Sequence, residues 1–473
     1  MLPNPQNYMI FPSVVPADQA VEMTIVAAER AFIPTADFQY AIKIIAVNGD
    51  ESSNYYQPTP QASFAVGVLD GSVRFSYTFC EEQEYLIRLF RDEKMIAELH
   101  VYSLYEDLYA LIPLRGDFHG HSYRSDGKRD PAALAGHYRE QGYDFFALTD
   151  HNRFYPGREI EEAYKGVALG ITRVSGEEIH TPPSPVHIVH VGGKNSVAFE
   201  YLKERESYEA QKATYLARVP EHIPQKYAAR YAMAMWATDR IHANGGMAIF
   251  AHPYWLPSAS QCHNVCDELA RILLKSGMFD AYELVGGMSP LEISRSVALW
   301  ADLRAEGVDI AVVGSSDVHG IHKSKTFPHY FTVCFATANE NDAIMDAVRA
   351  KRSVAVQAHG DEYQRQYTTY GSLRYVSYAN FLLKYYFPER TRTCAGEGVA
   401  MRAYAIGAVP PALVELTVQM NADDADRFFG RKPPLLPTRE MIDSAARHRA
   451  YHIENGPITR GSGIDSAVVT RQL

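Results

Sequence analysis

Histidine and carboxylate residues are gathered in short motifs in the middle of this 473-residue chain. Fourteen of the 18 histidines lie between residues 113 and 330. Imidazole and carboxylate groups without thiolate are typical of zinc, manganese or iron sites that do hydrolytic chemistry, rather than of structural zinc sites. The motifs, in chain order, are His119-Gly120-His121 with Ser125-Asp126-Gly127, then Thr149-Asp150-His151, Gly176-Glu177-Glu178, a segment with His187 and His190, Ala251-His252-Pro253, and Ser316-Asp317-Val318-His319.

The spacing within these motifs suits shared metal ligation. Residues i and i+2 of a strand point to the same face, so His119 and His121 can hold one ion together. The same spacing relates Asp317 to His319. A single carboxylate such as that of Glu178 can bridge two ions about 3.5–4 Å apart, which is the separation that two-metal hydrolysis requires.

The residues around the motifs alternate between strand-like and helix-like patterns, which predicts parallel strands covered by helices. The motifs lie at the carboxyl ends of these strands, which meet at one mouth in a parallel barrel. Seven or eight such units in about 240 residues predict an α/β fold with a distorted (β/α) barrel. The expected strands are 114–118, 144–148, 171–174, 186–191, 247–251, 281–285, 308–313 and 330–335, and the expected helices are 131–141, 227–243, 290–306 and 341–351, with an inserted helical pair within 196–243.

The two flanks of the barrel lack such motifs. Residues 1–112 read as short strands rich in β-branched and aromatic residues, which predicts a β-sandwich-like accessory domain. The strand pattern ends near residue 358, and residues 359–473 read as a helical extension that packs against the barrel. The expected domains are therefore 1–112, 113–358 and 359–473.

The ordered set of six motifs resembles the PHP (polymerase and histidinol phosphatase) superfamily over about residues 114–358. The resemblance implies a barrel of PHP type with a site for two or three divalent ions: zinc, manganese or iron. It favours Glu178 over Glu177 as the bridging carboxylate, and His187 over His190 as a metal ligand. For His190, a packed core histidine is the plainer interpretation. The implied ligands are His119, His121 and Asp317 for the first ion, Glu178 as a bridge to a second ion held by His187 and His252, and Asp126, His151 and His319 for a third.

Other residues near the motifs are candidates for supporting roles. Asp150 is expected to orient a neighbouring ligand, His180 to lie behind the ligands or at the rim, and Glu283 to line the pocket or form an ion pair. The candidates for catalysis are Asp317 or His319, which could transfer the proton, and the bridging Glu178. Four basic residues in mouth-side loops could clamp phosphate oxygens, although such cations are usually solvated: Arg124, Lys128, Arg153 and Lys323.

The resemblance implies a metal-dependent phosphoesterase that hydrolyses a phosphomonoester or small phosphodiester with metal-activated water. Three alternatives stay open: a nuclease acting on nucleic-acid ends, a metal-dependent hydrolase of a non-phosphate ester or amide, and a non-catalytic metal-binding module. The formal charge of −10 and the lack of a basic stripe weigh against long nucleic acids, so a small phosphorylated substrate is favoured.

The remaining composition is that of an ordinary globular protein, with 47% hydrophobic and 22% charged residues. Five scattered cysteines fit a reducing compartment rather than a disulfide framework. The first residues lack the basic and apolar regions of a secretory signal, and the apolar runs are far shorter than the roughly 20 residues that a bilayer needs. We therefore expect a cytoplasmic protein without membrane association, as a monomer or a homo-oligomer.

Overall fold

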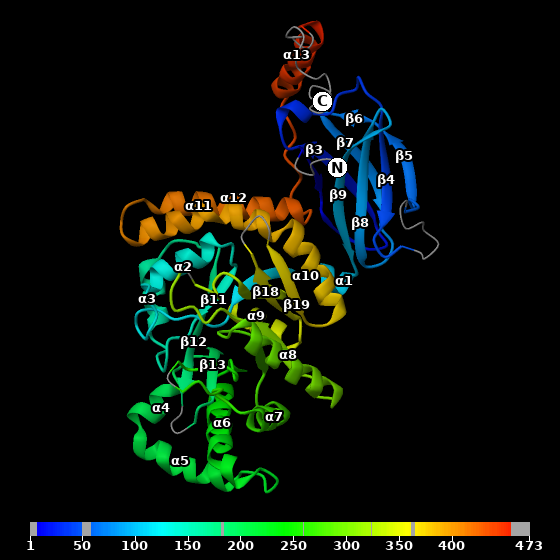
Figure 1. The fold of residues 1–473 in the computed structure, drawn as a ribbon. Coiled ribbons are helices and arrows are strands. Elements are labelled where there is room, and N and C mark those ends of the chain that lie inside the picture. The colour runs from blue at the N-terminus through cyan, green and yellow to red at the C-terminus, as the bar shows by residue number, and fades with distance from the viewer. Residues whose placement is uncertain are drawn as a thin grey trace, which may run out of the picture. The chain divides into compact units, whose positions relative to one another are not determined.

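The structure, a computed structural model, describes residues 7–49, 58–180, 184–258, 260–322, 324–360 and 365–455. The chain forms two compact units (Figure 1), one of Met1–Tyr109 with Asp424–Leu473 and one of Ala110–Asp423. The expected helical extension is thus divided between the two units. In the described part of the chain, no helix combines the length and the apolar character needed to cross a bilayer.

The first unit contains two sheets that share one hydrophobic core. Buried side chains of both sheets, such as Ile25 and Phe75 from one and Ile42 and Leu89 from the other, pack in a single cluster. The predicted sandwich-like arrangement is confirmed. The strand order is β1 (Tyr8–Phe11), β3 (Ala20–Ala27), β7 (Ser72–Thr78) and β6 (Val68–Leu69) in one sheet, and β2 (Val14–Pro16), β9 (Lys94–Leu104), β8 (Gln83–Arg91), β4 (Tyr40–Ala46) and β5 (Ala62–Val66) in the other.

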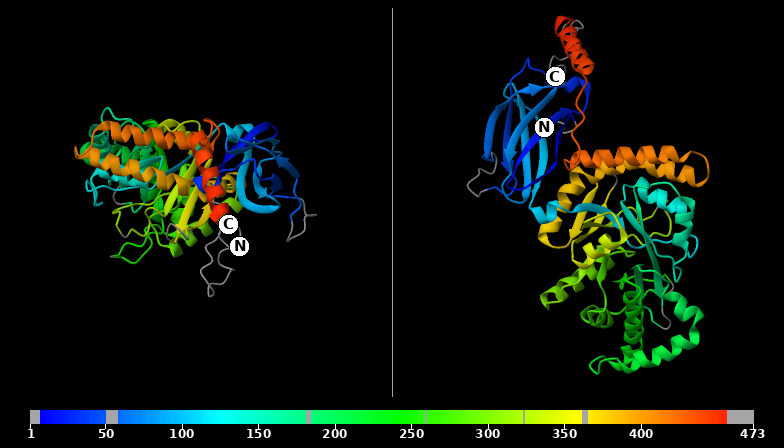
Figure 2. Two further views of the ribbon diagram at one scale, coloured as in Figure 1. Left: turned by 90° about the horizontal axis from the view of Figure 1, so that it is seen from above. Right: turned by 180° about the vertical axis from the view of Figure 1, so that it is seen from behind.

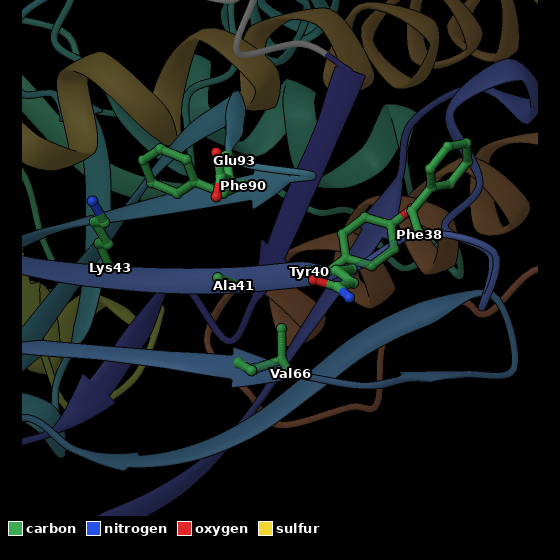
Figure 3. Close-up of a pocket in the computed structure, with 9 residues that line it drawn as sticks. Phe38, Tyr40, Ala41, Lys43, Val66, Phe90 and Glu93 are labelled. Carbon is green, nitrogen blue, oxygen red and sulfur yellow. The ribbon is translucent and has the colours of Figure 1, made fainter.

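Helix α13 (Arg439–Asn455) belongs to this unit, with η2 (Arg30–Phe32) and α1 (Glu106–Tyr109). Nη1 of Arg449 lies 3.7 Å from Oδ2 of Asp37, and its guanidinium lies 5.3 Å from the ring centroid of Phe38. The unit also has a cavity of about 630 Å³ beside Phe38 and Phe90 (Figure 3). None of the candidate metal ligands lines this cavity.

The second unit is built on a mixed sheet of ten strands that curls into a nearly closed barrel, so the predicted α/β barrel is confirmed. The barrel closes where Ser353 Oγ donates to Val312 O (2.9 Å) and Thr332 Oγ1 donates to Gly314 O (2.7 Å). Gly314 is needed there, because a Cβ atom would lie 2.3 Å from Phe331 O. The strand order is β16 (Ala311–Gly314), β15 (Ala281–Val285), β14 (Gly246–Phe250), β13 (His187–Gly192), β12 (Thr172–His180), β11 (Phe145–Leu148), β10 (Ile112–Asp117), β17 (Tyr330–Ala336), β18 (Ser353–His359) and β19 (Gln366–Tyr370).

The strand directions differ from the parallel arrangement that the sequence predicts. β10, β11 and β12 run parallel, as do β14, β15 and β16. β13 is antiparallel to both of its neighbours, and β17 is antiparallel to β10. The link 181–186 is too short for the crossover that parallel strands need, so β13 turns back from the barrel mouth. β18 and β19 were not predicted.

Helices cover the barrel, and two of them begin at a proline that follows a capping residue. Pro131 follows Asp130, whose side chain accepts from Ala132 N, and Pro290 follows Ser289, which forms a capping box with Glu292. The helices are α2 (Pro131–Glu140), α3 (Pro156–Ala163), α4 (Ala198–Lys203), α5 (Arg205–Ala217), α6 (Gln225–Ala243), α7 (Asp267–Lys275), α8 (Pro290–Ala305), α9 (Asn341–Arg349), α10 (Leu373–Tyr385), α11 (Phe387–Ala405) and α12 (Pro411–Phe428).

α11 and α12 lie side by side (Figures 1 and 2), and Asn421 Nδ2 donates to Glu397 Oε2 between them (2.7 Å). α11 also packs closely on α2, because a Cβ atom at Gly398 would lie 2.4 Å from Gly136 O. This contact is why most of the C-terminal helical region belongs to the barrel unit.

Candidate metal centre

Glu178 lies at the centre of the candidate site, and its two carboxylate oxygens face different groups of histidines. Oε2 faces three imidazole nitrogens, at 3.3 Å (His119 Nε2), 3.4 Å (His121 Nε2) and 2.7 Å (His151 Nδ1). Oε1 faces three others, at 2.8 Å (His187 Nδ1), 3.2 Å (His252 Nε2) and 3.5 Å (His180 Nε2). One buried carboxylate is therefore placed between two groups of imidazole nitrogens, as a bridging metal ligand must be.

The adjacent glutamate points away from this cluster, because successive side chains of a strand alternate between faces. Glu177 accepts hydrogen bonds from Val197 N (2.6 Å) and Ser196 Oγ (2.7 Å) at the start of α4. Nδ1 of the buried His190 lies 3.3 Å from Glu177 Oε1. Glu177 and His190 thus form a packed pair outside the candidate site.

Asp317 completes a first group of donors with His119 and His121. Its Oδ1 lies 3.4 Å from His119 Nε2 and 3.0 Å from His121 Nε2. The backbone of Asp317 adopts φ = 50°, a conformation that residues other than glycine rarely take. Gly287 packs against this carboxylate, since a Cβ atom there would lie 2.1 Å from Asp317 Oδ2.

Asp126 gathers a third group of donors on the solvent side of the site. Its carboxylate lies 3.3 Å from His151 Nε2 and 3.2 Å from His319 Nε2. The side chains of Asp126 and His319 are 55% and 38% exposed, whereas that of His119 is fully buried. This third group is therefore the most solvent-exposed part of the site.

The donor atoms of the three groups suit cations. Five buried donor atoms face one another and have no hydrogen-bond partner outside the cluster among the described residues: His119 Nε2, His121 Nε2, His187 Nδ1, Glu178 Oε2 and Asp317 Oδ1. When the lone pairs of buried nitrogen and oxygen atoms point toward one another and no hydrogen-bond donor is near, their burial costs free energy unless a cation binds them. The three ligand sets that the resemblance implies are each brought together, and the clusters are consistent with a site for several metal ions.

The charges of the site are strongly coupled. Burial by itself raises the pKa of Glu178, but the imidazoles of His119 and His187 outweigh it and hold that pKa well below its ordinary value. Burial lowers the pKa of His187 to about 4. Burial also lowers the pKa of His151 and His319, but hydrogen bonding to Asp126 outweighs it and raises the two values to about 10 and about 9. The carboxylates are therefore ionised at neutral pH, the form that binds cations.

Two of the expected supporting carboxylates hold parts of the site in place. The buried Glu283 accepts a hydrogen bond from His119 Nδ1 (2.9 Å), which leaves the lone pair of His119 Nε2 directed at the first group. Asp150 accepts from Ser122 Oγ (2.7 Å) and Ser125 Oγ (2.6 Å), in the loop between His121 and Asp126. His180 stacks on His187, with ring centroids 3.8 Å apart, and so lies within the cluster.

The expected phosphate clamps have other neighbours. Arg124 binds both carboxylate oxygens of Glu159, at 2.8 and 2.9 Å. Arg153 Nη1 donates to Tyr155 Oη (3.4 Å). The exposed Lys128 lies beside Gly320, its Cδ 3.5 Å from where a Cβ atom of that glycine would be. Lys323 lies outside the described residues.

Asp117, at the end of β10, is a buried residue of the site that the motifs do not single out. It accepts hydrogen bonds from Tyr138 Oη (2.9 Å) and Ser316 Oγ (2.5 Å). Burial raises its pKa to about 6, against the lowering effect of Ser316. The available signal was a carboxylate in an apolar strand, two residues before His119.

No family model and no curated protein matches the chain. Similar solved structures include a two-domain protein containing a predicted PHP-like metal-dependent phosphoesterase from Bacteroides vulgatus ATCC 8482, with 21% identity and a TM-score of 0.36 over 54% of this chain and 66% of that one. Another is a candidate metal-dependent phosphoesterase from Bifidobacterium adolescentis ATCC 15703, with 17% identity and a TM-score of 0.32 over 49% and 94% of the two chains. A third is an amidohydrolase from Chromobacterium violaceum with bound sulfate and no metal, with 21% identity and a TM-score of 0.30 over 45% and 89%.

The motifs and the geometry agree with one another. Residues far apart in the sequence, such as His119, Glu178 and Asp317, meet through the strand ends on which the motifs lie. The six motifs by which the sequence resembles the PHP superfamily are thus brought together by the barrel into clusters of candidate metal ligands.

Proposed function

We propose that the chain is a metal-dependent phosphoesterase that hydrolyses a phosphomonoester or a small phosphodiester. The observation that carries this proposal is the carboxylate of Glu178, whose two oxygens face separate groups of buried imidazole nitrogens. The ligands would be His119, His121 and Asp317 for one ion, Glu178, His187 and His252 for a second, and Asp126, His151 and His319 for a third. Bound ions of this kind lower the pKa of water to about 7 and neutralise phosphoryl oxygens.

The residues of the chain prepare the site in two ways. Burial of His119, Glu178 and His252 excludes bulk water from its deep side, while Asp126 and His319 leave the other side open to a substrate. Nδ1 of His319 donates to the backbone oxygen of Asp317 (2.9 Å), which fixes the ring and leaves Nε2 on the open side. If the site held two ions, this nitrogen would be available to transfer a proton to the leaving oxygen, and if it held three, His319 would be a ligand of the third.

Two observations favour a small substrate. The net charge of −10 opposes a long polyanion, which needs many cationic contacts to its phosphates. On the rim, Arg124 is already paired with both oxygens of Glu159. We therefore propose a small phosphorylated molecule as the partner rather than a nucleic acid.

The test uses the full-length chain stripped with a chelator and reloaded with zinc, manganese or iron. The substrates are p-nitrophenyl phosphate, bis(p-nitrophenyl) phosphate, p-nitrophenyl acetate and a single-stranded oligonucleotide. We expect hydrolysis of one or both small phosphoesters only in the reloaded protein, and its loss together with bound metal when His119 and His121 are both replaced by alanine.

Other outcomes would point to different functions. Cleavage of the acetate alone would indicate a hydrolase of non-phosphate esters, and cleavage of the oligonucleotide alone would indicate a nuclease. Stoichiometric metal without turnover of any substrate would indicate a non-catalytic metal-binding module.

A further inference from the structure

Asp117 is a fully buried carboxylate that none of the candidate ligand sets uses. Oδ1 accepts from the backbone N–H groups of His119 and Ser316, each at 3.0 Å. Oδ2 accepts from Ser316 Oγ at 2.5 Å and from Tyr138 Oη at 2.9 Å. Four donors on one carboxylate compensate for its burial, so this group holds its neighbours tightly.

The donors come from parts of the chain that no sheet ladder joins. His119 follows β10, Ser316 follows β16, and β10 pairs with β11 and β17 instead. In the described part of the chain, backbone pairing between the two loops is limited to the isolated bridge of Gly120 with Val318, with a hydrogen bond from His121 N to Val318 O (2.9 Å). Besides the contacts among the candidate ligands themselves, the hydrogen bonds of Asp117 join the two loops.

These two loops supply all three donors of the first group. His119 and His121 belong to one loop and Asp317 to the other, immediately after the serine that Asp117 holds. The relative position of His119 Nε2 and Asp317 Oδ1, now 3.4 Å apart, depends on how the loops are joined. An error of 1 Å there would spoil the coordination of a small cation.

We infer that Asp117 is a positioning residue that sets the distance between the two halves of the first metal site. This inference rests on the proposed function, because it requires an ion between His119, His121 and Asp317. Asp117 itself has no place among the ligands, since both of its oxygens are already occupied by donors. Its effect is exerted through Ser316 and Tyr138, which can be changed one at a time.

The experiment measures Co²⁺ binding to the full-length, chelator-treated chain, by visible absorption and by metal analysis. Ser316→Ala and Tyr138→Phe each remove one donor to Oδ2, and the double variant removes both. Tyr143→Phe is the matched control, because Tyr143 packs against Tyr138 and its hydroxyl is not among the four donors to Asp117. Asp117→Asn, which keeps an acceptor for the two backbone N–H groups, is the conservative variant beside Asp117→Ala.

We expect the double variant to bind one Co²⁺ per chain about 10- to 100-fold more weakly, with a changed visible spectrum. Tyr143→Phe should bind as the wild type does, and Asp117→Asn should retain more affinity than Asp117→Ala. The double variant decides the matter if Asp117→Ala fails to fold. Wild-type affinity and spectrum in a folded double variant would overturn the inference alone, whereas a wild-type chain that binds no Co²⁺ would overturn the proposed function as well.

Discussion

Oε1 of Glu178 lies 2.8 Å from Nδ1 of His187, although the two residues belong to strands that run in opposite directions. β12 reaches the barrel mouth near its end, and β13 begins there with His187. The antiparallel register also pairs Glu177 with His190 on the other face of the two strands. Two neighbouring buried glutamates therefore have separate tasks, one among the candidate ligands and one in the packing of α4.

Glu178→Gln and Glu177→Gln test this division. We predict that Glu178→Gln lowers metal affinity and phosphoesterase kcat by at least about 100-fold. Removing a residue that only supports a metal ligand costs about 10- to 100-fold, and removing the bridging ligand should cost no less than the upper end of that range. Glu177→Gln should keep both, and lose about 1 kcal/mol of unfolding free energy because it weakens the cap of α4. Metal analysis, initial rates and urea unfolding measure these effects. Equal metal loss in both variants would contradict the prediction.

The grouping of His119 with His121 agrees with their two-residue spacing, although both residues follow β10 and do not lie within a strand. The same spacing predicted a shared position for Asp317 and His319, whereas Asp317 lies with the first group and His319 with the third. The inward position of His187 could not be derived from its spacing. It depends on the reversal of β13, and parallel strands would place this residue at the far end of the barrel. The expectation that His187 is a metal ligand therefore came from the resemblance to the PHP superfamily and not from the local sequence pattern.

The contact between Asp117 and Ser316 is a second feature that the sequence alone does not predict. Their contact joins residues 199 positions apart and exists only because the barrel closes between β16 and the strands that follow it. Nothing in the local sequence of either residue encodes the partner. β18 and β19 were missed for a related reason, because strands added to the sheet after β17 depend on the neighbours that they pair with.

Metal binding is predicted to release protons. The raised pKa values of His151 (about 10) and His319 (about 9) mean that both are protonated at pH 7 in the metal-free chain, and an ion must displace those protons. Metal affinity should therefore rise between pH 7 and 9. Because both pKa values lie above the ordinary histidine value of about 6.5, protonation of the two side chains stabilises the metal-free fold. This stabilisation is complete below about pH 6.5 and is lost as the pH rises through 9 to 10.

Calorimetric titration of Zn²⁺ in buffers of different ionisation enthalpy counts these protons. Asp126→Asn is the control, because Asp126 is a main cause of both raised pKa values, and this variant should release fewer protons. A heat of binding that does not depend on the buffer would contradict the prediction.

Arg124 is predicted to act through Glu159. The pair is bidentate but about one-third exposed, so solvent screens it and it contributes little to stability. If Arg124 anchors the loop between His121 and Asp126, then Arg124→Ala and Glu159→Gln should raise KM for p-nitrophenyl phosphate by the same factor, below about 5-fold. Steady-state kinetics of both variants and of the double variant measure this. A much larger effect of Arg124→Ala alone would show that the guanidinium contacts the phosphate instead.

Glu397 is predicted to stabilise the barrel unit through Arg139. Both side chains are buried, with Nε of Arg139 2.8 Å from Oε2 of Glu397, which also accepts from Asn421 Nδ2. Without the Glu397 charge, the buried Arg139 keeps only the more distant contact of its Nη1 with Asp144 Oδ1 (3.3 Å), so Glu397→Gln should lower the unfolding free energy by about 3 kcal/mol. Glu389→Gln, on the same helix and 63% exposed, should change it by less than about 0.5 kcal/mol. Urea unfolding of both variants without added metal separates this effect from metal binding. Equal unfolding midpoints of Glu397→Gln and Glu389→Gln would show that α11 adds no stability through the pair of Arg139 and Glu397.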